Sequence, residues 1–249
     1  MDNPLVTSIV VAVATSFSIS AQADIVDVYF GGSSWQAAFS GEAQDGTTLI
    51  SIQDDLGIDD DSSNFIYFGL EHPLPVLPNI RLQRTDIGFA ASNEITAQID
   101  FEGEIFTVGE TVNSNADLTH TDVTLYWEVV DLIAELDLGI TARIFDGVFE
   151  LESDTVGSVQ EDFDDPIPML YARAGVNLPF TGLSLSLAAH GISFDDDVLY
   201  DATARVNYES KFGLGVEAGY RVLELEIDDE DVFADFSIDG VYAGLSYRF

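Results

Sequence analysis

Two of the three histidines stand where chemistry is conceivable, because a hydrolase needs a nucleophile, a histidine and an acid within hydrogen-bond reach. His120 has Asp122 two residues further along the chain. His190 follows Ser184 and Ser186 at an even spacing, so the three would share one face of a strand, which we call the same parity. Both histidines occupy polar positions of alternating segments, where hydrogen bonding within the fold is the commoner role. We therefore expect hydrogen-bonded residues here and no catalytic residues.

Clusters of aspartate are the second candidate site, since carboxylates bind Ca²⁺ and Mg²⁺. The residues concerned are Asp59, Asp60, Asp61, Asp195, Asp196 and Asp197. Ser62 and Ser63 follow the first cluster, with no glycine at the sixth position, so EF-hand spacing is lacking. We expect solvated acidic loops, with loosely bound divalent cations as the alternative, and no metal site or cofactor.

The composition excludes several classes of function. The 249 residues include 45 acids against eight Lys and Arg, which gives a net charge of −37 and argues against nucleic-acid binding. The chain has no cysteine, so disulfides and thiolate metal sites are impossible. Hydrophobic residues make up 47%, so we expect one folded domain that keeps its charges apart from its apolar part.

Residues 1–23 have the pattern of a secretory signal peptide. Leu5 to Phe17 is mostly apolar, and Ala21-Gln22-Ala23 forms a cleavage site before Asp24. The first four residues depart from the pattern because they contain no Lys or Arg. No later segment is apolar over the roughly 18 residues of a membrane helix, so a membrane protein made from residues 24–249 must span with strands.

The last nine residues, Val241 to Phe249, alternate apolar with small or polar side chains to the end of the chain. This is the period of a β-strand, and a tilted strand needs about 9–11 residues to cross a bilayer. Similar segments recur along the chain, whereas helical periodicity is scarce. We predict ten membrane strands, at about residues 25–36, 64–72, 79–90, 118–129, 135–149, 168–178, 183–194, 197–209, 212–224 and 237–249.

The connections alternate between two kinds. One kind is short and nearly neutral, and comprises Pro73–Pro78, Val130–Ile133, Pro179–Gly182 and Glu209–Lys211. The other kind is mostly longer and acidic. This asymmetry is typical of outer-membrane barrels, whose short turns face the periplasm. We therefore predict an all-β fold, a single up-and-down antiparallel transmembrane barrel. A hairpin expected at 94–108, turning at Glu102-Gly103-Glu104, would raise the count to twelve if it joined the wall.

Alternation alone does not say which face meets lipid, because a soluble barrel also alternates. The charges decide, since six of the eight basic residues share one parity of the wall strands and would pair with acids inside a narrow barrel. The predicted interior charges are Asp27, Arg81, Asp122, Glu128, Asp137, Arg143, Arg173, Asp201, Arg205, Glu217, Arg221 and Arg248. We expect Arg248 to face Asp27 where the last strand meets the first. Arg84 has the opposite parity, which we attribute to a bulge or a register error.

Aromatic residues on the other parity resemble the girdles of a membrane barrel, which lie at both lipid interfaces. The expected interface aromatics are Trp127, Tyr208, Phe212, Tyr247 and Phe249 near the short turns, with Tyr200 and Tyr220 nearer the other end. Phe249 would then be the last member of the periplasmic girdle.

Residues 24–249 as a whole resemble a family of small Gram-negative outer-membrane β-barrel proteins of uncharacterised function. The matching stretches are Asp55-Leu56-Gly57 to Asp61, Leu70-Glu71-His72-Pro73, Leu118-Thr119-His120-Thr121-Asp122, Leu138-Gly139-Ile140-Thr141-Ala142-Arg143, Leu178-Pro179-Phe180-Thr181-Gly182-Leu183 and Tyr247-Arg248-Phe249. The resemblance implies fold and location, and implies that the barrel assembly machinery reads the C-terminal aromatic residue. It implies no catalytic residues.

We accordingly expect an integral protein of the cell outer membrane, porin-like in fold, that is not an enzyme. Its lumen is expected to be largely plugged by ion pairs, because side chains fill most of a ten-stranded barrel. A narrow channel for small solutes is the alternative, and a lipid-modifying enzyme is the third. Expected partners are outer-membrane lipid, lipopolysaccharide and the assembly machinery, and loosely bound divalent cations remain the alternative for the acidic loops.

Overall fold

The fold is entirely β in the part of the chain that the structure describes. This computed structural model describes residues 26–45, 48–58, 61–195, 197–228 and 232–249. Every regular element in these ranges is a strand. None of these residues belongs to a helix that is long and apolar enough to span a membrane. The predicted signal peptide, residues 1–23, lies outside the described residues.

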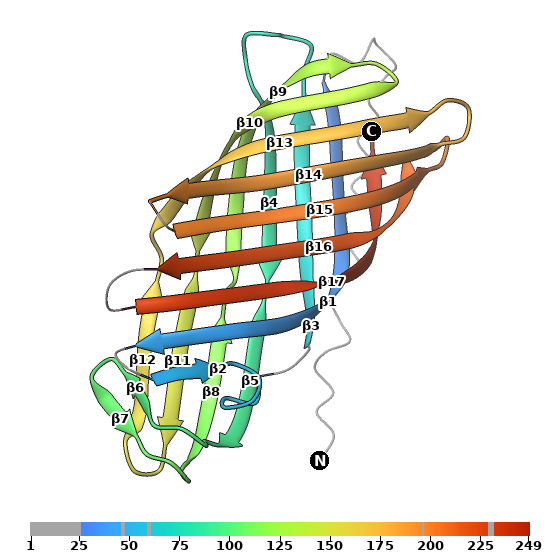
Figure 1. Ribbon diagram of the computed structural model, residues 1–249. Coiled ribbons are helices and arrows are strands. Elements are labelled where there is room, and N and C mark those ends of the chain that lie inside the picture. The colour runs from blue at the N-terminus through green and yellow to red at the C-terminus, as the bar shows by residue number, and fades with distance from the viewer. Residues whose placement is uncertain (1–25, 46–47, 59–60, 196, 229–231) are drawn as a thin grey trace.

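Ten strands form a closed antiparallel barrel (Figure 1). In order around the wall they are β1 (Asp27–Asp45), β3 (Asp61–Glu71), β4 (Asn79–Asp86), β9 (His120–Asp131), β10 (Ala134–Phe145), β13 (Pro166–Leu178), β14 (Leu183–Phe194), β15 (Asp197–Glu209), β16 (Leu214–Asp228) and β17 (Val232–Arg248). The ring closes because β17 pairs with β1, with Arg248 opposite Tyr29. The predicted fold class is confirmed, and β1 and β17 run further than predicted.

The wall continues beyond the barrel, at one end only, as a four-stranded sheet (Figure 1). Its strands are β5 (Gly88–Glu94), β8 (Thr111–Asp117), β11 (Gly147–Ser153) and β12 (Gly157–Phe163). Their order in the sheet repeats that of β4, β9, β10 and β13, which they prolong. We call this sheet the extension and this end of the barrel the extension end. The opposite end, with the short connections, is the turn end.

Two small elements stand beside the extension. β2 (Thr48–Ser51) pairs with β1, and β6 (Ile99–Phe101) pairs with β7 (Glu104–Phe106) in a sheet of their own. The hairpin turns through Glu102 and Gly103, both at positive φ, as the sequence predicts. Because this hairpin does not join the wall, the barrel keeps ten strands.

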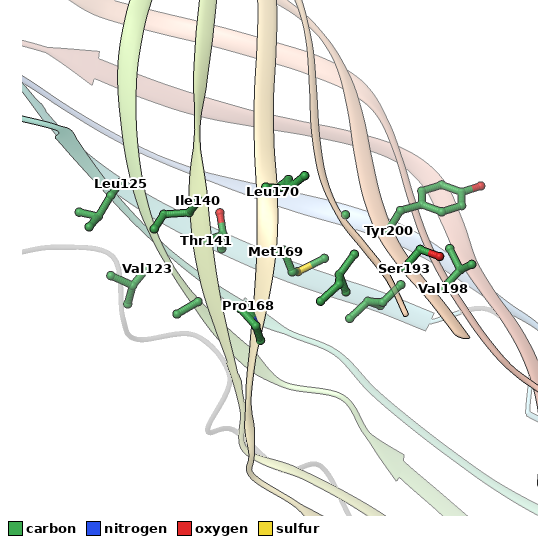
Figure 2. Close-up of a pocket in the computed structure, with 14 residues that line it drawn as sticks. Val123, Leu125, Ile140, Thr141, Pro168, Met169, Leu170, Ser193, Val198 and Tyr200 are labelled. Carbon is green, nitrogen blue, oxygen red and sulfur yellow. The ribbon is translucent and has the colours of Figure 1, made fainter. Parts of the chain in front are cut away.

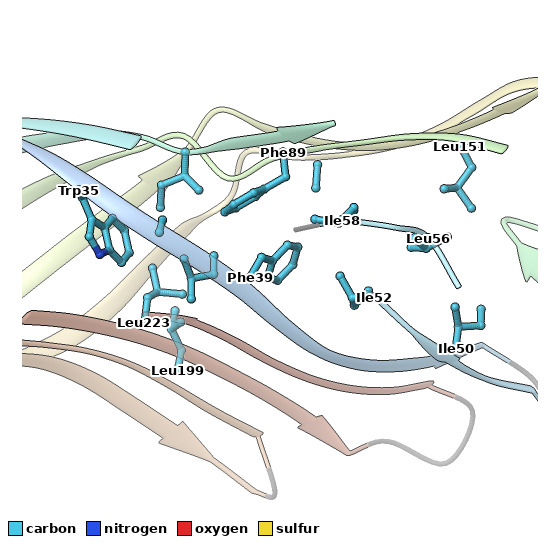
Figure 3. Close-up of a cluster of buried hydrophobic side chains, with 14 of the residues drawn as sticks. Trp35, Phe39, Ile50, Ile52, Leu56, Ile58, Phe89, Leu151, Leu199 and Leu223 are labelled. Carbon is cyan, nitrogen blue, oxygen red and sulfur yellow. The ribbon is translucent and has the colours of Figure 1, made fainter. Parts of the chain in front are cut away.

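An apolar core fills the extension end. It combines the inner faces of β1 and the extension with the connection between β2 and β3 (Figure 3). We call its principal members the apolar cap: Phe39, Ile50, Ile52, Leu56, Ile58, Phe89, Ile95, Ile99, Phe106 and Leu151. Full burial of each large side chain contributes roughly 1.5–3 kcal/mol. The cap therefore anchors the connection between β2 and β3, which has no regular secondary structure of its own in its described part.

The outer face of the wall is apolar over the barrel. Ile66, Leu170 and Leu187 are 62%, 73% and 65% exposed, on three different wall strands. In β3 the exposed and buried residues alternate, so the strand presents one apolar side outward and one side to the interior. A soluble barrel would bury this side, so the outward direction of the apolar parity follows the membrane pattern.

Candidate functional site

Four charged side chains form a layer across the interior. We call Asp122, Arg143, Asp201 and Arg221 the ionic layer. Arg143 donates two hydrogen bonds of 2.8 Å to the carboxylate of Asp122 and one of 2.6 Å to Asp201. Arg221 donates to both oxygens of Asp201, at 2.9 and 2.6 Å. These side chains, all at most 3% exposed, join β9, β10, β15 and β16 across the bore.

Aromatic rings cover the ionic layer. The guanidinium of Arg221 lies 4.8 Å from the ring centre of Trp35 and 5.3 Å from that of Phe65. It also donates to the hydroxyl of Thr85 at 3.1 Å. Such contacts stabilise a buried cation, and they fix its position as well. Trp35 and Phe65 lie on the interior parity of their strands, but the interior residues predicted from the sequence do not include them.

A second polar cluster lies nearer the turn end. Glu217 accepts hydrogen bonds from Ser33 at 2.6 Å and from Tyr67 at 2.7 Å, and an amino group of Arg205 lies 3.5 Å away. Arg205 also donates to the hydroxyl of Tyr242 at 3.2 Å. These partners come from five different wall strands, so the cluster ties the ring together.

Arg81 departs from the expected pairing. Its guanidinium lies 4.5 Å from the ring centre of Tyr67, and it donates to Gln83 at 2.8 Å. Within the described residues it makes no ion pair. Tyr67 has room because Gly31 lies against it, where a Cβ would fall 2.5 Å from the ring. An aromatic face thus replaces the carboxylate that the charge pattern predicts.

The remaining interior charges meet near the turn end. Arg173 lies 2.8 Å from Glu135 and 3.0 Å from Asp137. Arg248 contacts Asp27, the partner proposed from the closure of the ring. Beyond the pairs already described, Arg248 lies 3.2 Å from Glu71, and Glu128 accepts a hydrogen bond from Asn79 at 3.1 Å.

The interior narrows stepwise from the turn end. A polar cavity of about 610 Å³ opens there, lined by Asp27, Glu71, Glu135, Arg173 and Arg248 among others. We call it the vestibule. Beyond it lies a gap of about 30 Å³ between Arg81, His190, Arg205 and Arg221, which is the volume of about one water molecule. The ionic layer and then the apolar cap follow. Two buried layers, one ionic and one apolar, thus lie between the vestibule and the extension.

The histidines make structural hydrogen bonds. Nδ1 of His120 donates to the carbonyl of Leu118 at 2.8 Å, and His190 bonds the hydroxyl of Thr141 at 2.9 Å in place of the serines that precede it. His72 lies 3.2 Å from the carbonyl of Pro78 and holds a turn. All three histidines of the chain are thus placed, and none lies on the extension.

One group of buried side chains has the spacing of metal ligands. Single ligand atoms of His120, Asp122 and Asp201 lie within 4.8 Å of one another. Both carboxylates are already engaged by guanidinium groups, which supply the positive charge that a metal ion would bring. The arrangement therefore fits an ion-pair network and not a metal centre.

The two aspartate clusters are only partly described. Asp59, Asp60 and Asp196 lie outside the described residues. Asp61 accepts a hydrogen bond of 2.6 Å from the backbone N–H of Ser62. Within the described part of the chain, Asp61, Asp195 and Asp197 form no group with the spacing of metal ligands.

Aromatic side chains lie on the outer face at the turn end. Trp127, Tyr208, Phe212 and Phe249 are well exposed there. Tyr247 packs against Phe249, with ring centres 4.8 Å apart. The hydroxyls of the two aromatics expected nearer the other end donate to acids on the outer face, Tyr200 to Glu224 and Tyr220 to Asp239.

Arg84 lies on the outer face with no bulge. β4 pairs with β3 and β9 in continuous register, with Arg84 opposite Ile66 and Thr121, so the expected bulge or register error is wrong. The side chain is 44% exposed and forms ion pairs with Asp86 at 3.0 Å and Asp146 at 3.9 Å. It sits where β4 reaches the extension, and the two acids there satisfy its charge.

No family model matches the sequence, and no curated protein matches it. Among solved structures, the chain is similar to the outer membrane protease OmpT from Escherichia coli, with 8% identity and a TM-score of 0.52, covering 92% of this chain and 99% of that one. The translocator domain of the autotransporter NalP from Neisseria meningitidis gives 10% identity and a TM-score of 0.48, over 89% and 88%. At such identities the likeness to OmpT shows a shared barrel fold alone.

Proposed function

We propose that this protein is an integral barrel of the bacterial outer membrane that is not an enzyme and does not conduct. The turn end faces the periplasm, and the extension stands outside the cell. The apolar outer face, the aromatic residues at the turn end and the OmpT-like fold support this location. Its role is then to hold the acidic extension at the cell surface.

The double closure of the bore carries the proposal. Asp201 binds Arg143 from β10 and Arg221 from β16, so the ionic layer spans the interior. Buried pairs of this kind resist disruption, since removing one partner leaves an uncompensated charge. The apolar cap seals the same bore from outside. A solute would have to displace both layers.

The surface chemistry suggests the partners. The chain carries 45 acids and eight basic residues, and those basic residues lie in the wall or at the turn end. The extension would therefore meet lipopolysaccharide phosphates only through bridging divalent cations, which we keep as proposed partners with outer-membrane lipid. The resemblance to small outer-membrane barrels supports recognition of Phe249 by the assembly machinery.

Planar-bilayer recording of the refolded full chain tests the proposal. We expect no steady unit conductance from the wild-type protein. A stable unit conductance that rises in Arg143→Ala or Arg205→Ala would overturn it, because the pairs would then only narrow an open pore. Heat-modifiable migration on a gel is the control that each sample holds a folded barrel.

A narrow channel is the second candidate, and the vestibule favours it. This cavity of about 610 Å³ opens at the turn end and carries both acidic and basic side chains. A small ion could enter it as far as the gap between Arg81 and Arg205. Conductance that appears only above a threshold voltage would support a gated channel over a permanently closed barrel.

A further inference from the structure

The wall opens between two neighbouring strands near the extension end. β13 and β14 pair from Leu178 opposite Leu183 up to Leu170 opposite Gly191, and there the ladder stops. Both strands continue: β13 reaches back to Pro166 and stays paired with β10, whereas β14 runs on to Phe194 beside β15. Between this pair and the extension end the two strands separate, because β13 continues the line of β12 in the extension and β14 does not.

Two prolines keep this edge open. Pro166 and Pro168 lie opposite Ile144 and Ala142 in the ladder with β10. A proline has no N–H to donate, so it fits a ladder only where its nitrogen faces away from the partner strand. Both nitrogens therefore face the side of β14. That edge lacks two donors, and the ladder cannot extend across the gap.

A hollow of about 850 Å³ occupies the outer wall at this place (Figure 2). We call it the lateral groove. Its lining is almost wholly apolar and includes Ile140, Ala142, Pro168, Leu170, Gly191 and Val198. Figure 2 shows Pro168, Met169 and Leu170 along one strand, with Val198 and Tyr200 across from them.

Buried side chains of interior parity form much of the floor of the lateral groove. Thr141 and Met169, which line it from the interior parity, are both 2% exposed. The hydroxyl of Thr141 is held between Thr124 at 2.8 Å and His190 at 2.9 Å. This part of the floor is therefore packed and hydrogen-bonded, whereas the groove opens on the outer face through Leu170 and Ile140, which are 73% and 54% exposed.

Gly191 leaves space that a side chain could fill. A Cβ there would lie 3.7 Å from Cβ of Tyr200 and 3.8 Å from the carbonyl oxygen of Leu199, which are ordinary contacts. Gly219 differs, since its Cβ would fall 2.1 Å from a backbone oxygen. The backbone thus requires glycine at 219 but not at 191, where the missing side chain enlarges the groove.

We propose that the lateral groove binds an acyl chain of an outer-leaflet membrane lipid, and this rests on the membrane location proposed above. The groove is continuous with the apolar outer face through Leu170 and Ile140. Water would find few hydrogen-bond partners in a hollow lined this way, whereas a hydrocarbon chain fits its chemistry. The protein is then a lipid-binding barrel as well as a closed one.

Lipid retention tests the groove. The full chain is reconstituted in vesicles of phosphatidylethanolamine and phosphatidylglycerol, extracted in mild detergent and weighed with its bound lipid by native mass spectrometry. Gly191→Trp and Ala142→Phe each fill the groove from a different strand. Ala218→Trp is the matched control, because Ala218 faces outward on β16 away from the groove.

We expect the wild-type protein and Ala218→Trp to retain phospholipid, and each groove variant to lose on the order of tenfold in occupancy, about 1.4 kcal/mol. A groove variant that floats with vesicles and retains as much phospholipid as the wild-type protein would overturn the proposal. If Gly191→Trp does not fold, the phospholipid retained by Ala142→Phe gives the answer. A wild-type protein that floats but retains no lipid overturns the groove alone. One that does not float overturns the membrane location too.

Discussion

Loss of Arg143 should destabilise the barrel strongly. Arg143 binds Asp122 through two hydrogen bonds and Asp201 through a third, with no exposed surface. In Arg143→Ala both acids lose a buried partner, so we predict a loss of about 3–5 kcal/mol in the free energy of unfolding. Urea unfolding of the protein refolded in vesicles measures it.

Arg84 provides the matched control for that variant. It also forms two ion pairs, but its side chain is 44% exposed and that of Asp86 is 64% exposed. Exposed pairs contribute about 0–1 kcal/mol, so Arg84→Ala should unfold close to the wild-type urea concentration. Equal losses in the two variants would show that burial does not set the strength of these pairs.

Interior charges were predictable from the sequence as a set, whereas most of their partners were not. Parity assigns a residue to a face of its strand, and the closure of the ring brings Arg248 to Asp27. Parity does not give the height of a residue in the barrel. The pair of Arg143 and Asp201 joins β10 to β15, two strands that are not neighbours, so only the folded ring reveals it.

The connection between β2 and β3 behaves as part of the core. Ile52, Leu56 and Ile58 are at most 3% exposed, and Asn93 of β5 donates to the carbonyl of Asp55 at 2.9 Å. We predict that Ile52→Ser loosens the extension because it places a hydroxyl among apolar side chains. Hydrogen exchange should quicken in β5 and β8 and stay unchanged in β15 and β16.

A surface substitution in the connection between β7 and β8, next to the extension, is the control for the cap. Val108 is 63% exposed, so Val108→Ser should leave hydrogen exchange in β5 and β8 as it is in the wild-type protein. Faster exchange of β15 and β16 in Ile52→Ser would contradict the prediction, since the cap would then support the whole barrel and not the extension alone.

The half of β1 nearer the extension end explains why the sequence did not predict the cap. Trp35, Ala37 and Phe39 are buried on the parity that carries Asp27 at the other end of the strand. The sequence predicts charged interior residues on that parity and an end of the strand at about residue 36. One strand thus faces a polar interior in its first half and an apolar core in its second. A single parity rule for the membrane wall cannot describe both halves.

The distribution of basic residues over the whole molecule gives a direct test of its topology. Trypsin cleaves after Lys and Arg, and Lys211 lies in a short connection at the turn end, away from the extension. Glu102 and Glu104 lie exposed at the tip of the β6–β7 hairpin. In intact cells, a glutamate-specific protease should cut the protein while trypsin leaves it whole.

The same two proteases give the opposite result if the barrel is inverted. Exposed loop tips are where proteases cut, whereas paired strands resist them. Cleavage by trypsin from outside, with the fragment ending at Lys211, would place the turn end at the cell surface. A preparation of broken cells, in which both ends are accessible, controls for the activity of both enzymes.

The recording that tests the double closure most directly compares four proteins in a planar bilayer. They are the wild type, a variant with residues 49–58 replaced by a glycine-serine linker, Arg143→Ala with Arg221→Ala, and the combination of the two changes. On the proposal that either layer alone is enough to seal the bore, we predict steady conductance from the combined variant only. Steady conductance from the wild type, or from either partial variant, would contradict the account.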